Sequence, residues 1–140
     1  MPTVAPTDVD AKEDLRILVV DDNRANQRVT ALLLGELGYA PDTAGNGIEA
    51  IEAIERQPYD IVFMDMQMPE LGGLEATRII RRRFPGSRGP LVVGLSGYAS
   101  NDTRHECLAA GMNHYLVKPV TLEQFAATIA QLTAVPAADA

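Results

Sequence analysis

The sequence has little material for covalent cross-links or for membrane insertion. Its single cysteine, Cys107, cannot form an internal disulfide, and no other Cys or His lies at metal-ligand spacing from it. We therefore expect Cys107 to be a half-buried, small apolar residue. No uninterrupted apolar run approaches the roughly 20 residues that cross a bilayer, so we expect no membrane contact by this chain.

The chain also lacks a secretory leader and a surplus of basic residues. Its first residues, MPTVAPTDVDAKED, carry prolines and acids in place of the apolar stretch of a signal peptide. We therefore expect an intracellular, cytoplasmic protein. The net charge of −7 argues against nucleic-acid binding, which needs a basic surface. The one basic cluster, RIIRRRF at 78–84, is interpreted as the solvated face of a helix.

The length favours one compact domain. A chain of 140 residues hides roughly two-thirds of its unfolded surface, which is enough for a real core. Residues 1–14 and 134–140 are rich in Ala, Pro and Asp and show no periodicity, so we expect flexible tails at both ends. The folded domain is predicted to span residues 15–133.

Short apolar runs alternate with helical patterns between these tails. Runs of this kind are typical of buried parallel strands, and the alternation predicts an α/β protein with helices on both faces of one sheet. The predicted strands are Ile17–Val20, Ile61–Met64, Leu91–Leu95 and Tyr115–Val117, with the more polar 40–44 as an edge strand. Two helices are predicted from apolar stripes: Val29, Leu32, Leu33 and Leu37, and Leu122, Phe125, Ala126 and Ile129. The segment 100–111 has few large apolar residues, so its helix should be weakly anchored and able to move.

Polar residues follow four of the predicted strands. Because ligands of open parallel sheets gather at the carboxyl ends of the strands, these residues are expected to converge. They are Asp21 and Asp22, Asp65, Ser96, and Lys118 with Pro119. Each one alone is more simply interpreted as a helix cap or a turn residue, but the joint pattern is harder to explain that way.

The predicted cluster has the composition of a phosphoryl-transfer site. Three neighbouring carboxylates disfavour one another's ionisation, so a cation is expected among them, and oxygen ligands without Cys or His favour Mg²⁺. Lys118 offers a positive charge and Ser96 a hydroxyl donor for a phosphoryl group. Asp65 is then placed as the carboxylate nucleophile.

A competing motif is GNGIEA at 45–50. It matches the glycine pattern of a dinucleotide-binding turn, and Asp65 lies 20 residues after Gly45, near the spacing of a ribose-binding acid. The preceding segment 40–44 is too short and polar for the buried strand that such a motif follows. We therefore interpret the glycines as a tight strand-to-helix turn.

Taken together, the motifs resemble the receiver domain of two-component response regulators. The resemblance covers residues 16 to about 132 and rests on ILVVDDN, DIVFMDMQMPELGGLEATR, VVGLSGYA and YLVKP in this order. It is strongest to receivers attached to hybrid histidine kinases. It implies a flavodoxin-like fold, in which five parallel strands lie in the order 2-1-3-4-5.

The resemblance also implies a role for each site residue. Asp65 would be the phosphoacceptor, with Mg²⁺ (or Mn²⁺) as the cofactor. Asp22 would bind the metal directly, Asp21 through water and Gln67 through its backbone carbonyl. Lys118 and Ser96 would contact the phosphoryl group, and Tyr115 would be the aromatic residue that turns inward on activation.

Two glycines depart from the family pattern, and two further residues bear on phosphate lifetime. Gly97 stands where the family usually has Ala, which leaves room for the phosphoryl group and loosens the loop. Gly72 stands where the family usually has Asp. Gln67 and Tyr98 occupy positions that influence how long the phosphate survives.

We expect a self-phosphorylating signalling domain that turns over no external substrate. Its expected partner is a histidine kinase or a histidine phosphotransfer protein, which would dock on Arg24, Ala25, Arg28, Pro119 and Val120. A weak phosphorylation-dependent dimer is also compatible with the resemblance. The alternatives are an aspartyl-phosphate phosphohydrolase, disfavoured because Gln67 cannot act as its general acid, and a nucleotide- or flavin-binding flavodoxin-like domain.

Overall fold

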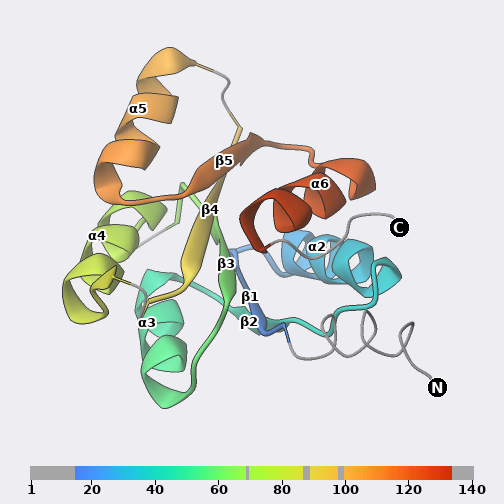
Figure 1. Cartoon of the computed structure of the whole chain (residues 1–140), viewed down its shortest axis with the longest axis horizontal. Helices are drawn as coiled ribbons and strands as arrows, with labels where there is room; N and C mark the ends of the chain where they lie inside the picture. Colours follow the sequence, from blue (N-terminus) through green and yellow to red (C-terminus); the bar gives the residue numbers. More distant parts are fainter. Residues whose placement is uncertain (1–14, 69, 87–88, 98–99, 134–140) are drawn as a thin grey trace.

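Alternating strands and helices fold into one parallel sheet with helices on both sides (Figure 1). The computed structural model describes residues 15–68, 70–86, 89–97 and 100–133. The predicted tails 1–14 and 134–140, and Tyr98, lie outside the described residues. The strands are β1 (Ile17–Val20), β2 (Asp42–Ala44), β3 (Ile61–Asp65), β4 (Leu91–Ser96) and β5 (His114–Val117). The helices are α2 (Arg24–Glu36), α3 (Gly47–Arg56), α4 (Gly73–Arg83), α5 (Asn101–Ala110) and α6 (Leu122–Thr133).

The sheet order is β2-β1-β3-β4-β5, and every neighbouring pair is parallel. This confirms the predicted α/β class and strand order. The edge strand β2 is limited to three residues, and β3 and β4 each extend one residue further than predicted, to Asp65 and Ser96. Both polar side chains therefore belong to the rigid ends of strands.

Alternating side chains of the strands divide between two apolar clusters, one on each face of the sheet. Val62 and Met64 of β3 pack with α3, α4 and α5, whereas Ile61 and Phe63 pack with α2 and α6. Phe63 meets Phe125 of α6 edge to face, with ring centroids 5.1 Å apart. Burial on both faces explains why the central strand is apolar without interruption.

Helix α2 turns a different face to the core than its sequence predicted. Val29 and Leu32 are 56% and 65% exposed, whereas Leu34 is buried among the residues facing α6. The run of leucines at 32–34 fits more than one helical register, and packing against α6 selects the one that buries Leu34. The predicted stripe is therefore wrong at Val29 and Leu32, which leaves two apolar side chains on the surface.

Helix α5 is anchored only near its C-terminal end. Its buried residues are Cys107 and Ala110, and none of the residues from Asn101 to Glu106 is buried. Cys107 is fully buried, not half-buried as expected, and its Sγ lies 3.6 Å from Met66 Sδ. The weak anchoring predicted for this segment is thus confined to its first half. None of the helices within the described ranges is long and apolar enough to span a membrane.

Candidate functional site

Three carboxylates meet at the carboxyl edge of the sheet. Asp21 follows β1, Asp22 is the next residue, and Asp65 ends β3, which is the neighbour of β1. One carboxylate oxygen from each lies within 4.8 Å of the others. Asp21 and Asp65 are only 2% and 5% exposed, whereas Asp22 faces solvent. The acids predicted to converge are therefore brought together, with one side of the cluster open.

Lys118 is the cation that the structure itself supplies. Its Nζ lies 3.1 Å from Asp65 Oδ1 and 3.5 Å from Asp21 Oδ2. The following peptide bond, Lys118–Pro119, is cis. One ammonium cannot balance three carboxylates, so the cluster keeps a deficit of positive charge.

The electrostatic environment of Asp65 combines opposing influences. Burial raises the pKa of its carboxyl above the ordinary value, and the neighbouring Asp21 charge adds to this, while the hydrogen bond and charge of Lys118 and the Gln67 N–H oppose it. A further cation beside Asp65 would favour the ionised form. A carboxylate held this way is available as a nucleophile once that charge is present.

Close packing behind Asp65 fixes the end of β3. Met66 N–H donates to Leu95 O at 3.0 Å, and Gly73 N–H donates to Met66 O at 3.2 Å. A Cβ placed on Gly73 would lie 2.4 Å from the carbonyl oxygen of Asp65, which is closer than nonbonded atoms approach. Only glycine therefore allows α4 to begin this near the strand. Its neighbour Gly72 precedes α4 and makes no side-chain cap, as expected of a residue without a side chain.

The residues expected to contact a phosphoryl group lie around this centre. Ser96 is buried at the end of β4, and its carbonyl accepts a hydrogen bond from Lys118 N–H at 2.7 Å. Gly97 is exposed, and none of the described residues lies within 4 Å of a Cβ built on it. Gln67 is exposed, and its N–H donates to Asp65 Oδ1 at 3.3 Å.

Tyr115 lies apart from the acids, in β5. It is half-buried, and its hydroxyl donates to the carbonyl of Ser100 at 3.4 Å, just before α5 begins. It therefore touches the N-terminal end of the weakly anchored helix. The structure places the Tyr115 hydroxyl beside Ser100, and not among the carboxylates.

The residues predicted to dock a partner border the same edge. Arg24, Ala25, Arg28 and Pro119 are exposed, and Val120 is half-buried. A cavity of about 350 Å³ lies beside them, and its lining includes Val29, Leu33, Lys118, Pro119 and Val120. Val29 and Leu32, which the sequence assigned to the core, are exposed, and Val29 lines this cavity.

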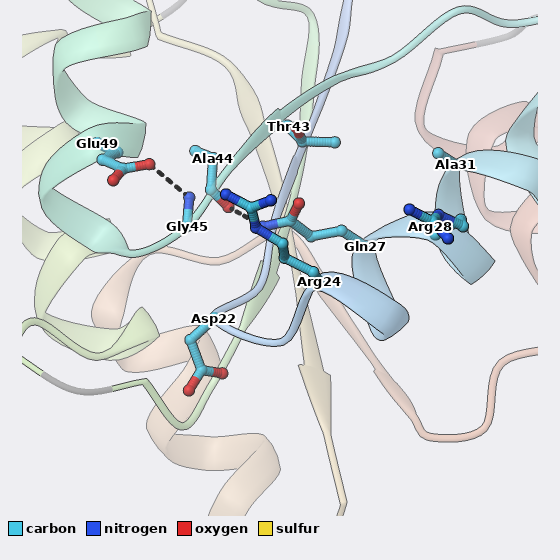
Figure 2. Close-up of a pocket in the computed structure, with 9 residues that line it drawn as sticks. All are labelled: Asp22, Arg24, Gln27, Arg28, Ala31, Thr43, Ala44, Gly45 and Glu49. Atoms are coloured by element: carbon cyan, nitrogen blue, oxygen red, sulfur yellow. Dashed lines mark hydrogen bonds between the residues drawn. The ribbon is translucent and has the colours of Figure 1, made fainter.

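A second, polar cavity of about 500 Å³ opens between α2, β2 and the start of α3 (Figure 2). Here GNGIEA forms the β2–α3 turn, with Asn46 capping α3. Two N–H groups of the turn are bonded within it: Gly45 N–H donates to Glu49 Oε1 at 2.7 Å and Glu49 N–H to Asn46 Oδ1 at 2.9 Å. The arrangement agrees with a tight turn and argues against a dinucleotide site.

The same view shows a residue that sequence reasoning missed. Gln27 of α2 donates from its side-chain amide to the carbonyls of Asp21 and Ala44, at 2.6 and 3.1 Å. Its place six residues after Asp21 gives no hint of these contacts.

The donor set fits a hard divalent cation. Three carboxylates converge within 4.8 Å, no Cys or His takes part, and the exposed Asp22 leaves a path from solvent. Oxygen ligands of this kind suit Mg²⁺, which typically uses one or two carboxylates and keeps several waters. The edge of the sheet can therefore hold a metal ion next to a nucleophilic carboxylate and an ammonium group.

Comparisons with known proteins point to one family. The family model described as "Response regulator receiver domain" matches residues 17–130. Hybrid signal transduction histidine kinase H of Dictyostelium discoideum is 43% identical over 113 residues, which are 78% of this chain and 8% of the kinase. Sensor histidine kinase RcsC of Salmonella typhi is 39% identical over 130 residues, which are 93% of this chain and 13% of the kinase. The chain thus spans about a tenth of the length of such relatives.

Two solved receiver structures are informative about the site. The receiver domain of sensor histidine kinase PA1611 from Pseudomonas aeruginosa is 37% identical, with a TM-score of 0.75 over 84% of this chain and 96% of that one. It was crystallised with a magnesium ion coordinated in its active site cleft. The receiver domain of Ssk1 from Saccharomyces cerevisiae is 29% identical, with a TM-score of 0.80 over 91% of this chain and 94% of that one. It was crystallised with the histidine phosphotransfer protein Ypd1.

Proposed function

The chain belongs to the response regulator receiver domain family, and on that premise we propose that Asp65 accepts a phosphoryl group from a phosphohistidine. The observation that carries the proposal is the meeting of Asp65, two further acids and Lys118 at one edge of the sheet. The family consists of receiver domains of two-component signalling, and the relatives of this chain include hybrid histidine kinases.

In the proposed reaction, a carboxylate oxygen of Asp65 attacks the phosphorus in line with the bond to the donor's imidazole nitrogen. An O–P bond forms as the N–P bond breaks, and the nitrogen keeps the electron pair; with a proton on the other ring nitrogen, the donor leaves as neutral imidazole. Lys118, 3.1 Å from Asp65 Oδ1, is placed to stabilise negative charge on the transferring group. The rigid end of β3 holds the nucleophile in position, so little reorganisation is needed.

We propose Mg²⁺ as the cofactor, with Mn²⁺ as a substitute. Asp22 would bind it directly, Asp21 through water and Gln67 through its backbone carbonyl, together with Asp65. The ion would neutralise charge on the phosphoryl oxygens during transfer. The converging acids and the magnesium ion in the PA1611 receiver support this assignment.

After transfer, we propose that the phosphoryl group changes the balance of conformations on the β4 side of the site. Ser96 would hydrogen-bond the group, Gly97 would leave it room, and Tyr115 would turn inward as the segment before α5 moves. Phosphate would thereby stabilise a conformation that already exists at a lower population. The exposed first half of α5 supports motion there.

For the partner, we propose a histidine kinase or histidine phosphotransfer protein that docks beside Asp65. The surface comprises Arg24, Ala25, Arg28, Pro119 and Val120, extended by the exposed Val29 and Leu32. The Ssk1 receiver crystallised with a protein of this class supports the choice. We also place the domain in the cytoplasm, where a buried thiol such as Cys107 stays reduced.

The test is incubation of the chain with Mg²⁺ and a small phosphodonor, followed by intact mass measurement. We expect one added phosphoryl group, lost in Asp65→Asn and in the presence of a chelator. Asp60→Asn, a change to an exposed acid at the opposite end of β3, should leave the gain unchanged. Equal phosphorylation of the natural chain and Asp65→Asn would contradict the proposal.

The docking surface is tested by charge reversal. Arg28→Glu should slow transfer from a phosphorylated histidine phosphotransfer protein, while transfer from a small donor stays unchanged, because only the protein donor needs the surface. Arg82→Glu, on the exposed face of α4, is the matched control and should affect neither rate. Equal slowing of both donors by Arg28→Glu would contradict this surface.

A further inference from the structure

The two neighbouring acids Asp21 and Asp22 are held in different ways. The carboxylate of Asp21 accepts a hydrogen bond from Asn23 N–H at 2.9 Å and lies 3.5 Å from Lys118 Nζ. The carboxylate of Asp22 is exposed, and within the described ranges no hydrogen bond or ion pair joins it to another residue. The position of the Asp22 side chain therefore depends on the backbone that carries it.

That backbone is held by the side chain of Gln27. Its Nε2 lies 2.6 Å from Asp21 O, which is the carbonyl of the peptide joining Asp21 to Asp22, and 3.1 Å from Ala44 O. Both neighbours are carbonyl oxygens that can only accept, so the atom facing them is the NH₂ group with its two donors. Figure 2 shows Gln27 reaching from α2 toward Ala44, while the Asp22 carboxylate points away from both.

The preceding peptide, which joins Val20 to Asp21, is tied to the edge strand β2. Asp21 N–H donates to Ala44 O at 3.1 Å, so Ala44 O receives both Asp21 N–H and the Gln27 amide. The ends of β1 and β2 and the first turns of α2 are thus joined at one point. Because a peptide unit is planar, fixing its carbonyl also helps to fix the Cα of Asp22, from which the Asp22 side chain extends.

We propose that Gln27 is a positioning residue, whose amide fixes the Asp21–Asp22 peptide and so aims the Asp22 carboxylate at the metal ion. The inference rests on the metal site of the proposed function. Gln27 itself touches neither the ion nor the phosphoryl group. Partners that orient a metal ligand typically change metal affinity by about 10–100-fold when removed.

The test measures Mg²⁺ binding directly, by titration calorimetry on the full chain without a phosphodonor. Gln27→Met keeps the length of the side chain and removes both donors, and we expect about tenfold weaker binding. Gln57→Met is the matched control. The Gln57 amide also donates twice, to Asp42 Oδ2 at 3.0 Å and Tyr59 Oη at 2.7 Å, but it lies at the far end of β2. It should lower the urea midpoint without changing Mg²⁺ affinity.

A rescue variant separates positioning from general stability. Gln27→His places an N–H donor the same number of bonds from the backbone, and at about pH 8 its imidazole is neutral. We expect it to stay within about threefold of the natural affinity. If Gln27→Met does not fold, Gln27→Asn, whose amide is one methylene short of the carbonyls, replaces it with the same expected loss.

Three outcomes would overturn the inference. They are unchanged affinity in the variant without donors, equal weakening in Gln57→Met, and a loss in Gln27→His as large as in Gln27→Met. A natural chain that binds no Mg²⁺ would instead overturn the metal site of the proposed function. The two failures are therefore distinguishable.

Discussion

The two strand ends that flank Asp65 in the sheet are held very differently. On the β1 side, Asp21 is buried and bonded on both its side chain and its backbone, and Gln27 ties it to β2. On the β4 side, Gly97 is exposed, and within the described ranges only its chain neighbours come near the place of a side chain. The β1 side is thus held by several hydrogen bonds, whereas the described residues around Gly97 leave room on the β4 side.

The same contrast appears within α5. Its C-terminal end is secured by Arg81 of α4, which donates to Gly111 O at 2.8 Å, Pro90 O at 2.7 Å and Asn113 Oδ1 at 2.8 Å. Its N-terminal end is joined to β5 by the 3.4 Å contact of Tyr115 with Ser100. Movement of α5 should therefore begin at its first turn.

The largest predicted effect is a loss of stability on replacing Gly73, and Gly97 is the glycine to compare with it. Gly73→Ala puts a methyl group 2.4 Å from Asp65 O, so α4 or the end of β3 must shift. We expect a loss of about 3 kcal/mol in the free energy of unfolding, measured by urea denaturation. Gly97→Ala meets no described residue and should stay within about 0.5 kcal/mol. Similar losses in the two variants would contradict the difference between the ends of β3 and β4.

The next effect concerns the anchored end of α5. Arg81→Met removes three hydrogen bonds from a half-buried guanidinium, and we expect about 2 kcal/mol of destabilisation together with faster amide exchange around Gly111. Mg²⁺ affinity should not change, because the acids lie at the carboxyl ends of the strands, away from Arg81. Arg82→Met, at an exposed position one residue on, is the control and should have little effect. A loss of Mg²⁺ binding in Arg81→Met would show that the two regions are not independent.

A smaller effect follows from the raised pKa of Asp65. In the fold its carboxyl holds a proton at pH values where the unfolded chain, with the ordinary value of 3.8, has lost it. The protonated Asp65 carboxyl therefore contributes most to the free energy of unfolding below the unfolded-state pKa. This contribution is lost as pH rises through the folded-state pKa. Asp65→Asn should therefore raise the free energy of unfolding of the metal-free chain at neutral pH and flatten this part of the profile.

The measurement is urea denaturation from below pH 3.8 up to neutral pH, in the presence of a chelator. Glu52→Gln, at an exposed position on α3, should leave the profile as it is. If Asp65→Asn were less stable than the natural chain at neutral pH, burial would not be the dominant influence on this carboxyl.

The smallest effect concerns the loosely held end of α5. Tyr115→Phe removes one long hydrogen bond and should cost no more than about 0.5 kcal/mol. Amide exchange of residues 100–106 should nevertheless become faster, while exchange of β1 and β3 is unchanged. Tyr39→Phe, on the side of the sheet that carries α2, should not affect residues 100–106. Unchanged exchange in Tyr115→Phe would mean that this contact does not hold α5.

The sequence predicts the sheet and the acid cluster for a simple physical reason. Strands buried on both faces are continuous apolar runs, and the residues that end parallel strands must meet at one edge. The convergence of Asp21, Asp22 and Asp65 could therefore be predicted from the chain alone. The weakness of α5 could also be predicted, because its few large apolar residues leave little to bury.

Other features depend on distances that a one-dimensional pattern does not contain. The buried face of α2 depends on where α6 lies, so the leucine run at 32–34 suggested the wrong face. Gln27 acts on carbonyls of two strands, and Gly73 is required because α4 starts against the Asp65 carbonyl. The buried face of α2 and the contacts of Gln27 were missed because they exist only once the strands and helices are packed.

Amide hydrogen exchange before and after phosphorylation tests the central claim most directly. The chain would be incubated with Mg²⁺ alone and with Mg²⁺ and a small phosphodonor, and Asp65→Asn would be treated in the same way. We predict that the phosphodonor slows exchange of residues 100–106 in the natural chain only, with little change at the ends of β1 and β3. Unchanged exchange in the natural chain, or the same change in Asp65→Asn, would contradict a phosphoacceptor at Asp65 that acts through the β4 side of the site.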